Sequence, residues 1–547
     1  MKTVSLKSRS KSASNLAALI FLVAAWFDAS GATLGAVPGA YEIGAPVVTD
    51  LWIDPLKGND SNGGSSRNDA LRTMAAGINR IPARQTFTTR GYRLMLLPGS
   101  YGRGSVPGYI ESRYGTYQFP LIIQSAEGRG KALLTGDMKL FDMKYLYLID
   151  LDIIPDPAGD VVQCDRCEHL LIRGSELDGG KREAHDTLKV NQSSYVFVEE
   201  SIIEGARDNA VDFVAVQYGH VINSTIRNAG DWCMGARGGS AYLRIEGNEI
   251  SECGTGGFTA GHRTGLQLMQ VPWIHYEAYD IKVTNNIIHD SEDAGLGVSG
   301  GYNILLAHNT LFRVGSRSHM IEVTFGLRSC DGMPGDPARE LCTIYLIDGG
   351  WGTARVSDGT NDVRIPNRNV FIYNNVLYNP VGSSSEHTFL ISGPYTGAPQ
   401  EGSNVDVPTR ADVNLQLRGN IIWNPSGDLG IGPGTGCAST NPTCDETRFS
   451  VENLVNLLEP QLVYAIANDV HPIAGSNLSR FLPVSIPNFG WGDAPTRPAV
   501  PVGNLSNAVS YDRDGVFRRP INSAVGAYAL LVDVPPAFGR RRATTRR

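Results

Sequence analysis

A triplet with a polar first residue and an aliphatic last residue recurs through the middle of the chain. Five copies begin 23, 24, 38 and 23 residues apart: Ser201-Ile202-Ile203, Ser224-Thr225-Ile226, Asn248-Glu249-Ile250, Asn286-Ile287-Ile288 and Asn309-Thr310-Leu311. Further copies begin at Ser175, Asn375 and Asn420. A fixed period of this length indicates a repeat architecture.

The segments between the triplets carry short β-branched runs, such as Val196-Phe197-Val198 and Ile281-Lys282-Val283, without a helical pattern. This pattern predicts a parallel β-solenoid with two or three strands per coil. Coils stacked at ~4.8 Å would let the Ser or Asn of each triplet form a polar ladder. The third residue of each triplet would then face the core. A β-sandwich with chance turn spacing is the alternative.

The chain before the coils predicts a separate module. A short strand begins at Leu51, and an amphipathic helix runs from Leu71 to about Ile81, with Asn68 or Asp69 as its cap. An open solenoid end exposes apolar core and unpaired strand edges, so it needs a cover. We therefore expect this helix to cap the N-terminal end of an all-β solenoid.

The predicted organisation has four parts. Residues 1–32 read as a secretory signal, because a basic start precedes an apolar run, Leu16 to Trp26, that is too short to span a membrane. A retained anchor is the alternative. Residues 33–110 form the N-terminal module, residues 111–430 the coils, with loop insertions at 255–278 and 325–367, and residues 431–547 an irregular C-terminal cap with a basic tail.

The composition indicates the cellular compartment of the protein and argues against nucleic acid as a partner. The formal net charge of −7 over 547 residues gives no nucleic-acid signal, and no other run is long and apolar enough to cross a bilayer. The eight cysteines fall in close pairs, which suggests disulfides in a secreted chain. Cys164 and Cys167 could instead hold a metal, but no second pair completes a zinc site. We expect a secreted monomer, extracellular or periplasmic.

Carboxylates recur at coil spacing. Asp186, Asp208 and Asp231 lie 22 and 23 residues apart, each before a short strand. Stacked coils would gather them into one stripe, where like charges need a cation between them. Hard oxygen ligands from several coils suit calcium, with Asp212 as a fourth ligand. Asx-turns that cap backbone amides are an equally simple explanation of these residues.

The N-terminal order of strand, Gly-Asn-Asp-Ser-Asn-Gly-Gly loop (58–64), helix and Leu-Leu-Pro-Gly-Ser-Tyr (96–101) resembles secreted right-handed parallel β-helix proteins of the pectate-lyase-like superfamily. The segment Tyr511-Asp512-Arg513-Asp514-Gly515, followed by Val525-Gly526-Ala527-Tyr528, is similar to their closing segment. The resemblance implies the right-handed fold, whereas the activity varies within that fold.

In these families calcium and basic residues bind a uronate carboxylate, and a Lys or Arg removes the C5 proton before β-elimination. The resemblance thus implies a polysaccharide lyase that acts on an acidic polysaccharide, with Ca²⁺ as the cofactor that it suggests. Lys189 is the predicted base and Arg237 the carboxylate clamp, because a guanidinium binds bidentately and resists deprotonation. A solvated face or ion pairs to the Asp residues would explain both side chains equally well.

Two loop clusters add candidate substrate contacts. The first insertion carries His262, Arg263, Trp273, His275 and Tyr276, whose rings could stack on sugars, with His262 able to move a proton. Arg317 and His319 form a second polar cluster one coil later. Plain packing of these loops is the other explanation.

Other activities remain open. Polygalacturonases share the fold, but the chain has Gly261-His262-Arg263 in place of their Gly-His-Gly motif and lacks a clear Arg-x-Lys. A glycoside hydrolase with carboxylates among Asp208, Asp212 and Asp231, a uronate epimerase, and a non-catalytic glycan-binding adhesin all remain alternatives.

Overall fold

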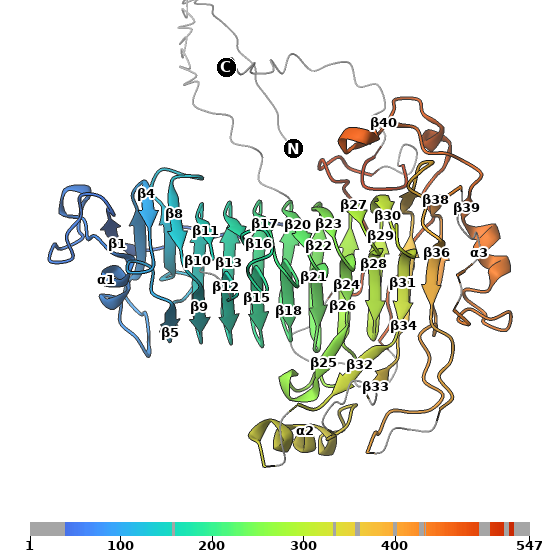
Figure 1. The fold of residues 1–547 in the computed structure, drawn as a ribbon, viewed down its shortest axis with the longest axis horizontal. Helices are drawn as coiled ribbons and strands as arrows, with labels where there is room; N and C mark the ends of the chain where they lie inside the picture. Colours follow the sequence, from blue (N-terminus) through green and yellow to red (C-terminus); the bar gives the residue numbers. More distant parts are fainter. Residues whose placement is uncertain are drawn as a thin grey trace, which may run out of the picture. The chain divides into compact units, whose positions relative to one another are not determined.

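The repeating triplets fold into three long parallel sheets in a computed structural model of the chain (Figure 1). The structure describes residues 39–155, 159–331, 335–355, 362–397, 402–425, 431–432, 434–491, 504–518 and 524–529. Residues from Ala40 onward belong to one compact unit. The predicted signal peptide at 1–32 and the basic tail from Arg540 to Arg547 lie outside the described residues.

Each coil adds one strand to each sheet in turn. Sheet A runs β1 (Val48–Ile53), β3 (Gly91–Leu96), β7 (Leu121–Ser125), β10 (Lys144–Ile149), β13 (Glu168–Arg173), β16 (Ser194–Glu199), β19 (Gln217–Ile222), β22 (Ser240–Glu246), β26 (Ala278–Thr284), β29 (Gly301–Ala307), β34 (Arg368–Tyr373) and β37 (Gln416–Arg418), with β2 (Gln85–Thr86) and β6 (Arg113–Tyr114) beside it.

Sheet B runs β4 (Gly99–Tyr101), β8 (Ala132–Thr135), β11 (Asp152–Ile154), β14 (Glu176–Asp178), β17 (Ile202–Glu204), β20 (Thr225–Ala229), β23 (Glu249–Cys253), β27 (Ile287–Ser291), β30 (Thr310–Val314), β35 (Val376–Tyr378), β38 (Ile421–Trp423) and β39 (Leu454–Val455). Sheet C runs β5 (Tyr109–Glu111), β9 (Met138–Phe141), β12 (Val162–Asp165), β15 (Leu188–Asn191), β18 (Val211–Val214), β21 (Trp232–Arg237), β24 (Gly256–Ala260), β28 (Ala294–Ser299), β31 (His319–Thr324) and β36 (His387–Ile391).

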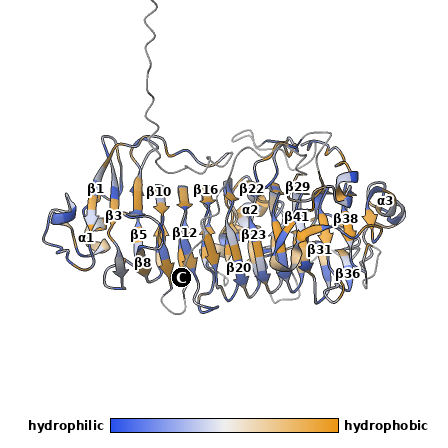
Figure 2. Ribbon diagram, turned by 90° about the horizontal axis from the view of Figure 1, so that it is seen from above, coloured by the Kyte–Doolittle hydropathy of each residue, from blue (hydrophilic) through white to orange (hydrophobic). Residues whose placement is uncertain are grey.

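The predicted core column and polar ladder are both confirmed. The third residues of the triplets are fully buried in one continuous core, and apolar residues colour the strands of the sheets in Figure 2. From Asn248 to Asn453, each asparagine Nδ2 donates to the Oδ1 of the next asparagine at 2.8–3.1 Å. In the earlier coils Ser175, Ser201 and Ser224 accept the backbone N–H of the preceding coil at 3.1–3.2 Å.

The N-terminal helix is shorter than predicted. Leu71 pairs with Ile53 in a β-bridge, so its backbone is extended and the helix α1 spans only Met74–Asn79. Thr73, not Asn68 or Asp69, caps it by accepting from the Ala76 N–H at 3.1 Å. Asp69 ends a short 3-10 helix, η1 (Arg67–Asp69). Met74 and Ile78 bury the inner face of α1 in the core shared with β1 and β3, and the capping role stays a prediction.

The insertions form a small sheet of their own. It consists of β25 (Arg263–Gly265), β32 (Gly326–Ser329) and β33 (Val363–Ile365), with η2 (Leu266–Leu268) and α2 (Pro337–Ile347) nearby. Residues 256–260, predicted as part of the first loop, are strand β24 of sheet C instead. The eight cysteines form four disulfides within the predicted close pairs: Cys164–Cys167, Cys233–Cys253, Cys330–Cys342 and Cys437–Cys444.

The chain after the last coil returns along the solenoid. It contains α3 (Glu446–Glu452), β40 (Leu462–Tyr464), η3 (Ala465–Ala467), β41 (Asp469–Pro472) and η4 (Asn477–Arg480). Further on, Arg513 donates to the carbonyl oxygens of Gly247 and Asn248 at 2.7 and 2.9 Å, and the Gly526 N–H donates to the Asn374 carbonyl at 2.8 Å. Among the described residues, no helix has the length and apolar character that a membrane crossing requires.

Candidate functional site

A cleft of about 220 Å³ opens on the solvent side of sheet C, across strands β15, β18, β21 and β24. Core residues such as Val190 and Phe213 alternate along these strands with residues that face away from the core. The cleft is lined by His185, Asp186, Lys189, Asp208, Asn209, Asp212, Asp231, Trp232, Gly235, Arg237, Thr259, His262 and Arg263. The fold therefore brings all four predicted metal ligands and all three predicted catalytic residues into one place.

One column of the cleft follows the strand register. Lys189, Asp212, Gly235 and Thr259 occupy equivalent positions on four successive strands. Gly235 leaves this column hollow, because a Cβ there would lie 3.8 Å from the Thr259 methyl group and 4.0 Å from the Asp212 carboxylate. The missing side chain thus creates the depression in the sheet.

A second column lies in the turns that precede these strands. The backbone N–H groups of Asp208, Asp231 and Thr255 each donate to a carbonyl of the coil before, at 2.9 Å, and the column begins at His185. Asp186 lies one residue off this column and aligns with Asn209 instead, whose backbone N–H donates to it. The predicted single stripe of Asp186, Asp208 and Asp231 is therefore wrong in register, because these coils are 23 residues long and Asp186 is 22 before Asp208.

A buried ion network forms the floor of the cleft. The Lys189 Nζ lies 2.6 Å from Asp186 Oδ2 and 3.4 Å from Asp212 Oδ2. Arg237 donates two hydrogen bonds to the Asp212 carboxylate, from Nε to Oδ1 at 3.0 Å and from Nη2 to Oδ2 at 2.8 Å. The two carboxylate side chains are 0% and 2% exposed, so two cations and two anions balance each other away from water.

The network opposes the predicted role of Lys189 as a base. Burial alone would lower the pKa of the Lys189 ammonium, but Asp212 and Asp186 outweigh it and raise the pKa above its ordinary value. Burial would raise the pKa of Asp212, yet Arg237 and Lys189 hold it below its ordinary value. Lys189 therefore stays protonated and Asp212 ionised, and neither is poised to exchange a proton near neutral pH.

The rim of the cleft carries the accessible carboxylates. Asp208 is 43% exposed, and its Oδ2 lies 3.1 Å from Nε2 of His185, which is itself 44% exposed. The Nδ1 of the same ring lies 3.3 Å from Asp186 Oδ2 and 3.5 Å from Asp160 Oδ1. In the part of the chain that the structure describes, the Asp231 carboxylate contacts no other charged side chain. Asp208 and Asp231 are thus the carboxylates that a ligand in the cleft can reach.

The predicted calcium site fits these donors poorly. Both oxygens of Asp212 accept from Arg237, and Asp186 Oδ1 accepts from the N–H and Nδ2 of Asn209 at 2.9 and 3.1 Å. Asp186 Oδ2 already accepts from Lys189. A carboxylate oxygen of Asp160, a carboxylate oxygen of Asp186 and a ring nitrogen of His185 lie close enough together to hold an ion. The Lys189 ammonium, however, already contacts Asp186 in that cluster. Calcium bound by all four predicted Asp residues stays a prediction that these hydrogen bonds disfavour.

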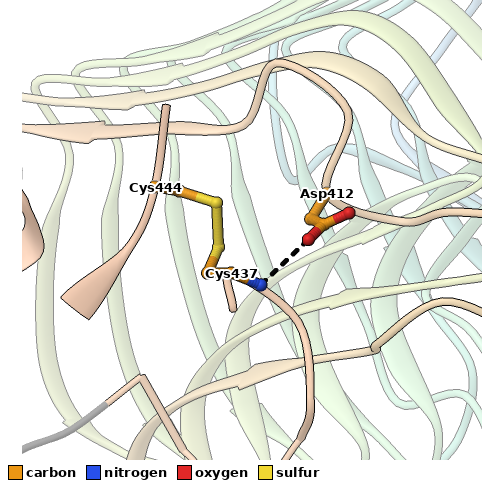
Figure 3. A group of neighbouring side chains, drawn as sticks. All are labelled: Asp412, Cys437 and Cys444. Carbon is orange, nitrogen blue, oxygen red and sulfur yellow. Dashed lines mark hydrogen bonds between the residues drawn. A yellow bond between two sulfur atoms is a disulfide. The ribbon is translucent and has the colours of Figure 1, made fainter. Parts of the chain in front are cut away.

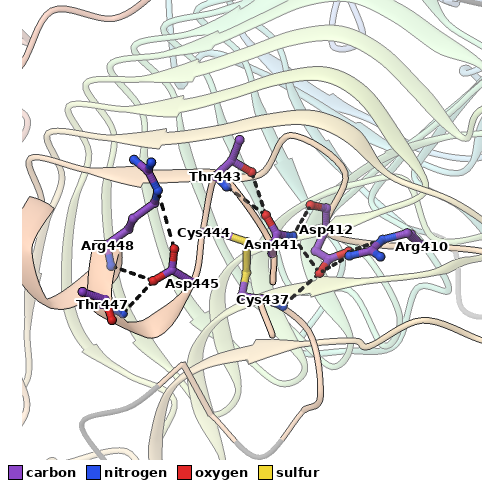
Figure 4. The surroundings of a disulfide bond; sticks show 9 residues. All are labelled: Arg410, Asp412, Cys437, Asn441, Thr443, Cys444, Asp445, Thr447 and Arg448. Carbon is purple, nitrogen blue, oxygen red and sulfur yellow. Dashed lines mark hydrogen bonds and ion pairs between the residues drawn. A yellow bond between two sulfur atoms is a disulfide. The ribbon is translucent and has the colours of Figure 1, made fainter. Parts of the chain in front are cut away.

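A second cluster of metal-ligating atom types is a structural cystine. Asp412 lies beside Cys437 and Cys444, but the two sulfur atoms are joined in a disulfide (Figure 3). Asp412 Oδ2 accepts from the Cys437 N–H at 2.9 Å, from Asn441 Nδ2 at 3.0 Å and from Arg410 at 3.1 Å (Figure 4). These bonds leave no thiolate for a metal, and they fix the turn that leads into α3.

Three predicted sugar contacts lie elsewhere. Trp273 and Tyr276 are only 5% and 3% exposed and pack in an aromatic cluster with Tyr279, Tyr302 and Trp351. His275 lies edge-on against Trp351, and burial together with Arg328 lowers its pKa to about 4. The rings of Trp273 and His275 pack the insertion against the solenoid, so we correct their assignment to substrate contact. Tyr276 also lines a separate cavity of about 370 Å³, and its contact with substrate stays a prediction.

Of the remaining predicted contacts, two line the cleft and two lie outside it. His262 and Arg263 line the cleft, with Arg263 Nε 2.7 Å from Asp362 Oδ2. Arg317 binds Glu292, Asp293 and the Gly254 carbonyl outside the cleft, and His319, 6% exposed, lies 3.3 Å from Glu322. Sequence reasoning missed His185, Trp232 and Thr259, although the 23-residue spacing from His185 to Asp208 would have revealed the first of them.

Comparison with known proteins supports the fold. The family model for a right-handed β-helix region matches residues 160–325, which include the whole cleft. This match and the parallel sheets confirm the predicted right-handed parallel β-helix. No curated protein matches the sequence significantly.

Several solved structures share the fold at low identity. The crystal structure of pectate lyase Pel9A is 12% identical over 89% of this chain and 98% of that one, with a TM-score of 0.43. The complex of XylC with xylose is 10% identical over 88% and 98%, with a TM-score of 0.42. The A-module of mannuronan C-5 epimerase AlgE6 from Azotobacter vinelandii is 12% identical over 63% and 88%, with a TM-score of 0.37. At these identities the likeness concerns the fold alone.

Proposed function

We propose that the protein is a secreted carbohydrate-active enzyme and that the cleft on sheet C cleaves a polysaccharide. The observation that supports this most is the division of charge in the cleft. Lys189 and Arg237 are bound to buried carboxylates, whereas Asp208 and Asp231 stand on successive coils with oxygens that a ligand can reach. The four disulfides are consistent with an oxidising, extracytoplasmic compartment.

Hydrolysis of a glycosidic bond is the reaction that these groups suit best. It needs two carboxyl groups that flank the bond, one to protonate the leaving oxygen and one to activate water or attack the sugar. Adjacent coils place the backbones of Asp208 and Asp231 ~4.8 Å apart, and their side chains can bracket a sugar link between them. His185, bonded to Asp208, orients that carboxylate. Trp232 and Thr259 also line the cleft, but both are almost fully buried, and the Thr259 hydroxyl donates to the Gly261 carbonyl at 2.8 Å.

Elimination from a uronate is the second candidate, and one observation favours it. Arg263 stands at the cleft with 44% of its side chain exposed and an ion pair to Asp362. A uronate carboxylate can replace Asp362 there, which would stabilise the enolate-like transition state. The proton acceptor would then be His262 rather than Lys189, because Asp186 and Asp212 keep the ammonium protonated. Among the described residues of the cleft, every cation has a carboxylate partner, so hydrolysis of a less acidic chain remains the better fit.

The products separate the two reactions. Purified protein should be incubated with neutral and with uronate-rich polysaccharides, and the products assayed for new reducing ends and for the ultraviolet absorbance of unsaturated uronates. We expect reducing ends without that absorbance. Unsaturated products would establish elimination instead. Binding of a polysaccharide without any cleavage would leave a glycan-binding adhesin as the function.

Variants of the two rim carboxylates test the assignment of the residues. Asp208→Asn and Asp231→Asn should each lower kcat by about 10²–10⁴-fold, the usual worth of an acid or base, while binding of the polysaccharide persists. Glu252→Gln, at an exposed position on the neighbouring coil, is the matched control and should keep full turnover. Full activity in both Asp variants would rule out these residues as the catalytic pair.

A further inference from the structure

We infer that the Lys189 ammonium takes the place of a divalent cation in this cleft, so that the protein carries a built-in counter-ion for its buried carboxylates. This inference does not rest on the proposed function, because it concerns only what neutralises Asp186 and Asp212. The spacing of the aspartates predicts a calcium site from the sequence. The inference explains why the oxygens of Asp186 and Asp212 instead accept hydrogen bonds from side chains and backbone of the protein.

The position of the ammonium follows from the register. Lys189 and Asp212 face the same way on adjacent strands, and Asp186 lies three residues before Lys189, just ahead of strand β15. The lysine stem therefore has to pass between the two carboxylates. Its Nζ ends 2.6 Å from one and 3.4 Å from the other, which is the bridging place that a metal ion would occupy.

The charges of Asp186 and Asp212 are balanced by side chains of the protein itself, while Asp160 adds a third carboxylate beside Asp186 and His185. Asp186 and Asp212 contribute two negative charges, and Lys189 and Arg237 contribute two positive charges. A calcium ion bridging the same carboxylates would have to lie against the Lys189 Nζ, which is 2.6 Å from Asp186 and 3.4 Å from Asp212, and the two cations would repel each other. Calcium also requires six to eight oxygen ligands, and the oxygens of both carboxylates already accept hydrogen bonds from Lys189, Arg237 or Asn209.

Removal of the ammonium should therefore create a cation site. In Lys189→Met the stem keeps its apolar volume but the charge is lost, and Asp186 Oδ2 and one side of Asp212 Oδ2 become available. His185 Nδ1 lies 3.3 Å from this oxygen of Asp186, and a carboxylate oxygen of Asp160 lies within 4.8 Å of both residues' ligand atoms, so the two side chains can add to the ligand set. Lys139 occupies the same column two strands earlier and is exposed, so Lys139→Met is a matched control.

Thermal unfolding with and without calcium tests this prediction. Wild-type protein and Lys139→Met should keep the same Tm in a chelator and in millimolar calcium. Lys189→Met should have a lower Tm in the chelator and should recover several degrees in calcium, because a ligand that binds only the folded state stabilises it. The double variant Lys189→Met with Asp186→Asn should fold without calcium and should not respond to it, since the carboxylate that loses its cation has been neutralised while Asp212 keeps Arg237.

Terbium luminescence provides a second measurement, and its wild-type arm does not depend on any variant folding. Trp232 lines the cleft and can sensitise the luminescence of a terbium ion bound there. We expect no sensitised emission from the wild-type protein and strong emission from Lys189→Met. Wild-type emission that disappears in Asp186→Asn would overturn the inference, because it would place a cation beside the ammonium. A calcium response of Lys189→Met no larger than that of the wild type would overturn it as well.

Discussion

Replacing Asn286 in the polar ladder should destabilise the solenoid more than a single lost hydrogen bond suggests. The Asn286 side chain is fully buried, and its Oδ1 accepts from the backbone N–H of Asn248 at 2.9 Å and from Asn248 Nδ2 at 3.0 Å. Its Nδ2 donates to the Ile245 carbonyl and to Asn309 Oδ1, both at 2.9 Å. Asn286→Ala removes all four bonds without giving water access to the groups left behind.

The size of the effect follows from the groups that lose their partner. Asn309 Oδ1 keeps the Asn286 N–H at 3.0 Å, and Asn248 Nδ2 keeps its bond to the Val221 carbonyl at 2.8 Å. The backbone N–H of Asn248 and its other Nδ2 hydrogen are stranded. A stranded buried donor costs about 1–3 kcal/mol, so the variant should lose about 2–6 kcal/mol in the free energy of unfolding. Asn286→Ser should lose about half as much, because a serine oxygen at this register accepts the backbone N–H of the preceding coil, as Ser224 does for Ser201.

Guanidinium unfolding of the three proteins would give the two differences, and hydrogen exchange would show whether the Asn248 amide opens locally. The order wild type, Asn286→Ser, Asn286→Ala is the essential prediction, since the two variants differ only in one restored acceptor. Equal losses for Ser and Ala, or an Asn286→Ala loss below about 1 kcal/mol, would refute the stranded-donor reasoning.

Two further predictions concern pH and disulfides. Burial lowers the pKa of the His289 imidazole, but Asp290 and Glu249, 2.7 and 3.2 Å away, raise it above 6.5. A histidine whose pKa is raised in the folded state stabilises the fold fully below pH 6.5, and this stabilisation is lost as the pH rises through the pKa of the folded state. The Tm difference between wild type and His289→Gln should therefore shrink as the pH rises from 6 to about 8. A Tm difference that stays constant with pH would contradict this prediction. The Cys233–Cys253 bridge spans 20 residues, so replacing both cysteines by alanine should cost about 3 kcal/mol in unfolding free energy, and an unchanged denaturation midpoint would show that the bridge adds nothing.

The repeat could be predicted from the sequence because one spacing sets both register and burial. Ile203, Ile226 and Ile250 recur at the coil length and are all fully buried, and the Ser and Asn residues two positions before them form the ladder. A period expresses contacts between neighbouring coils, and these are the contacts that hold a solenoid together. The same spacing also gathered Asp208 and Asp231 at the cleft.

The details of the site required the structure, because they depend on shifts of one residue and on distant partners. Asp186 precedes Asp208 by 22 residues, whereas the coil is 23 residues long. Asp186 therefore lies outside the turn column and accepts a hydrogen bond from Lys189, which changes the role of both residues. Tyr276 packs on Trp351, far along the chain in a different insertion, and no local pattern announces that contact. For the same reason the sequence could not show that Trp273 and His275 pack against other rings of the insertion.

The returning segment near the C-terminus has a consequence for how a newly made chain is monitored. Ala527 and Tyr528 cover Ile287 and Phe312, apolar residues of sheet B that otherwise face outward. Until residues 527 and 528 have been synthesised, more apolar surface is exposed on this flank of the solenoid. A chain that ends before residue 527 would therefore leave Ile287 and Phe312 less covered and would present more apolar surface to chaperones and proteases.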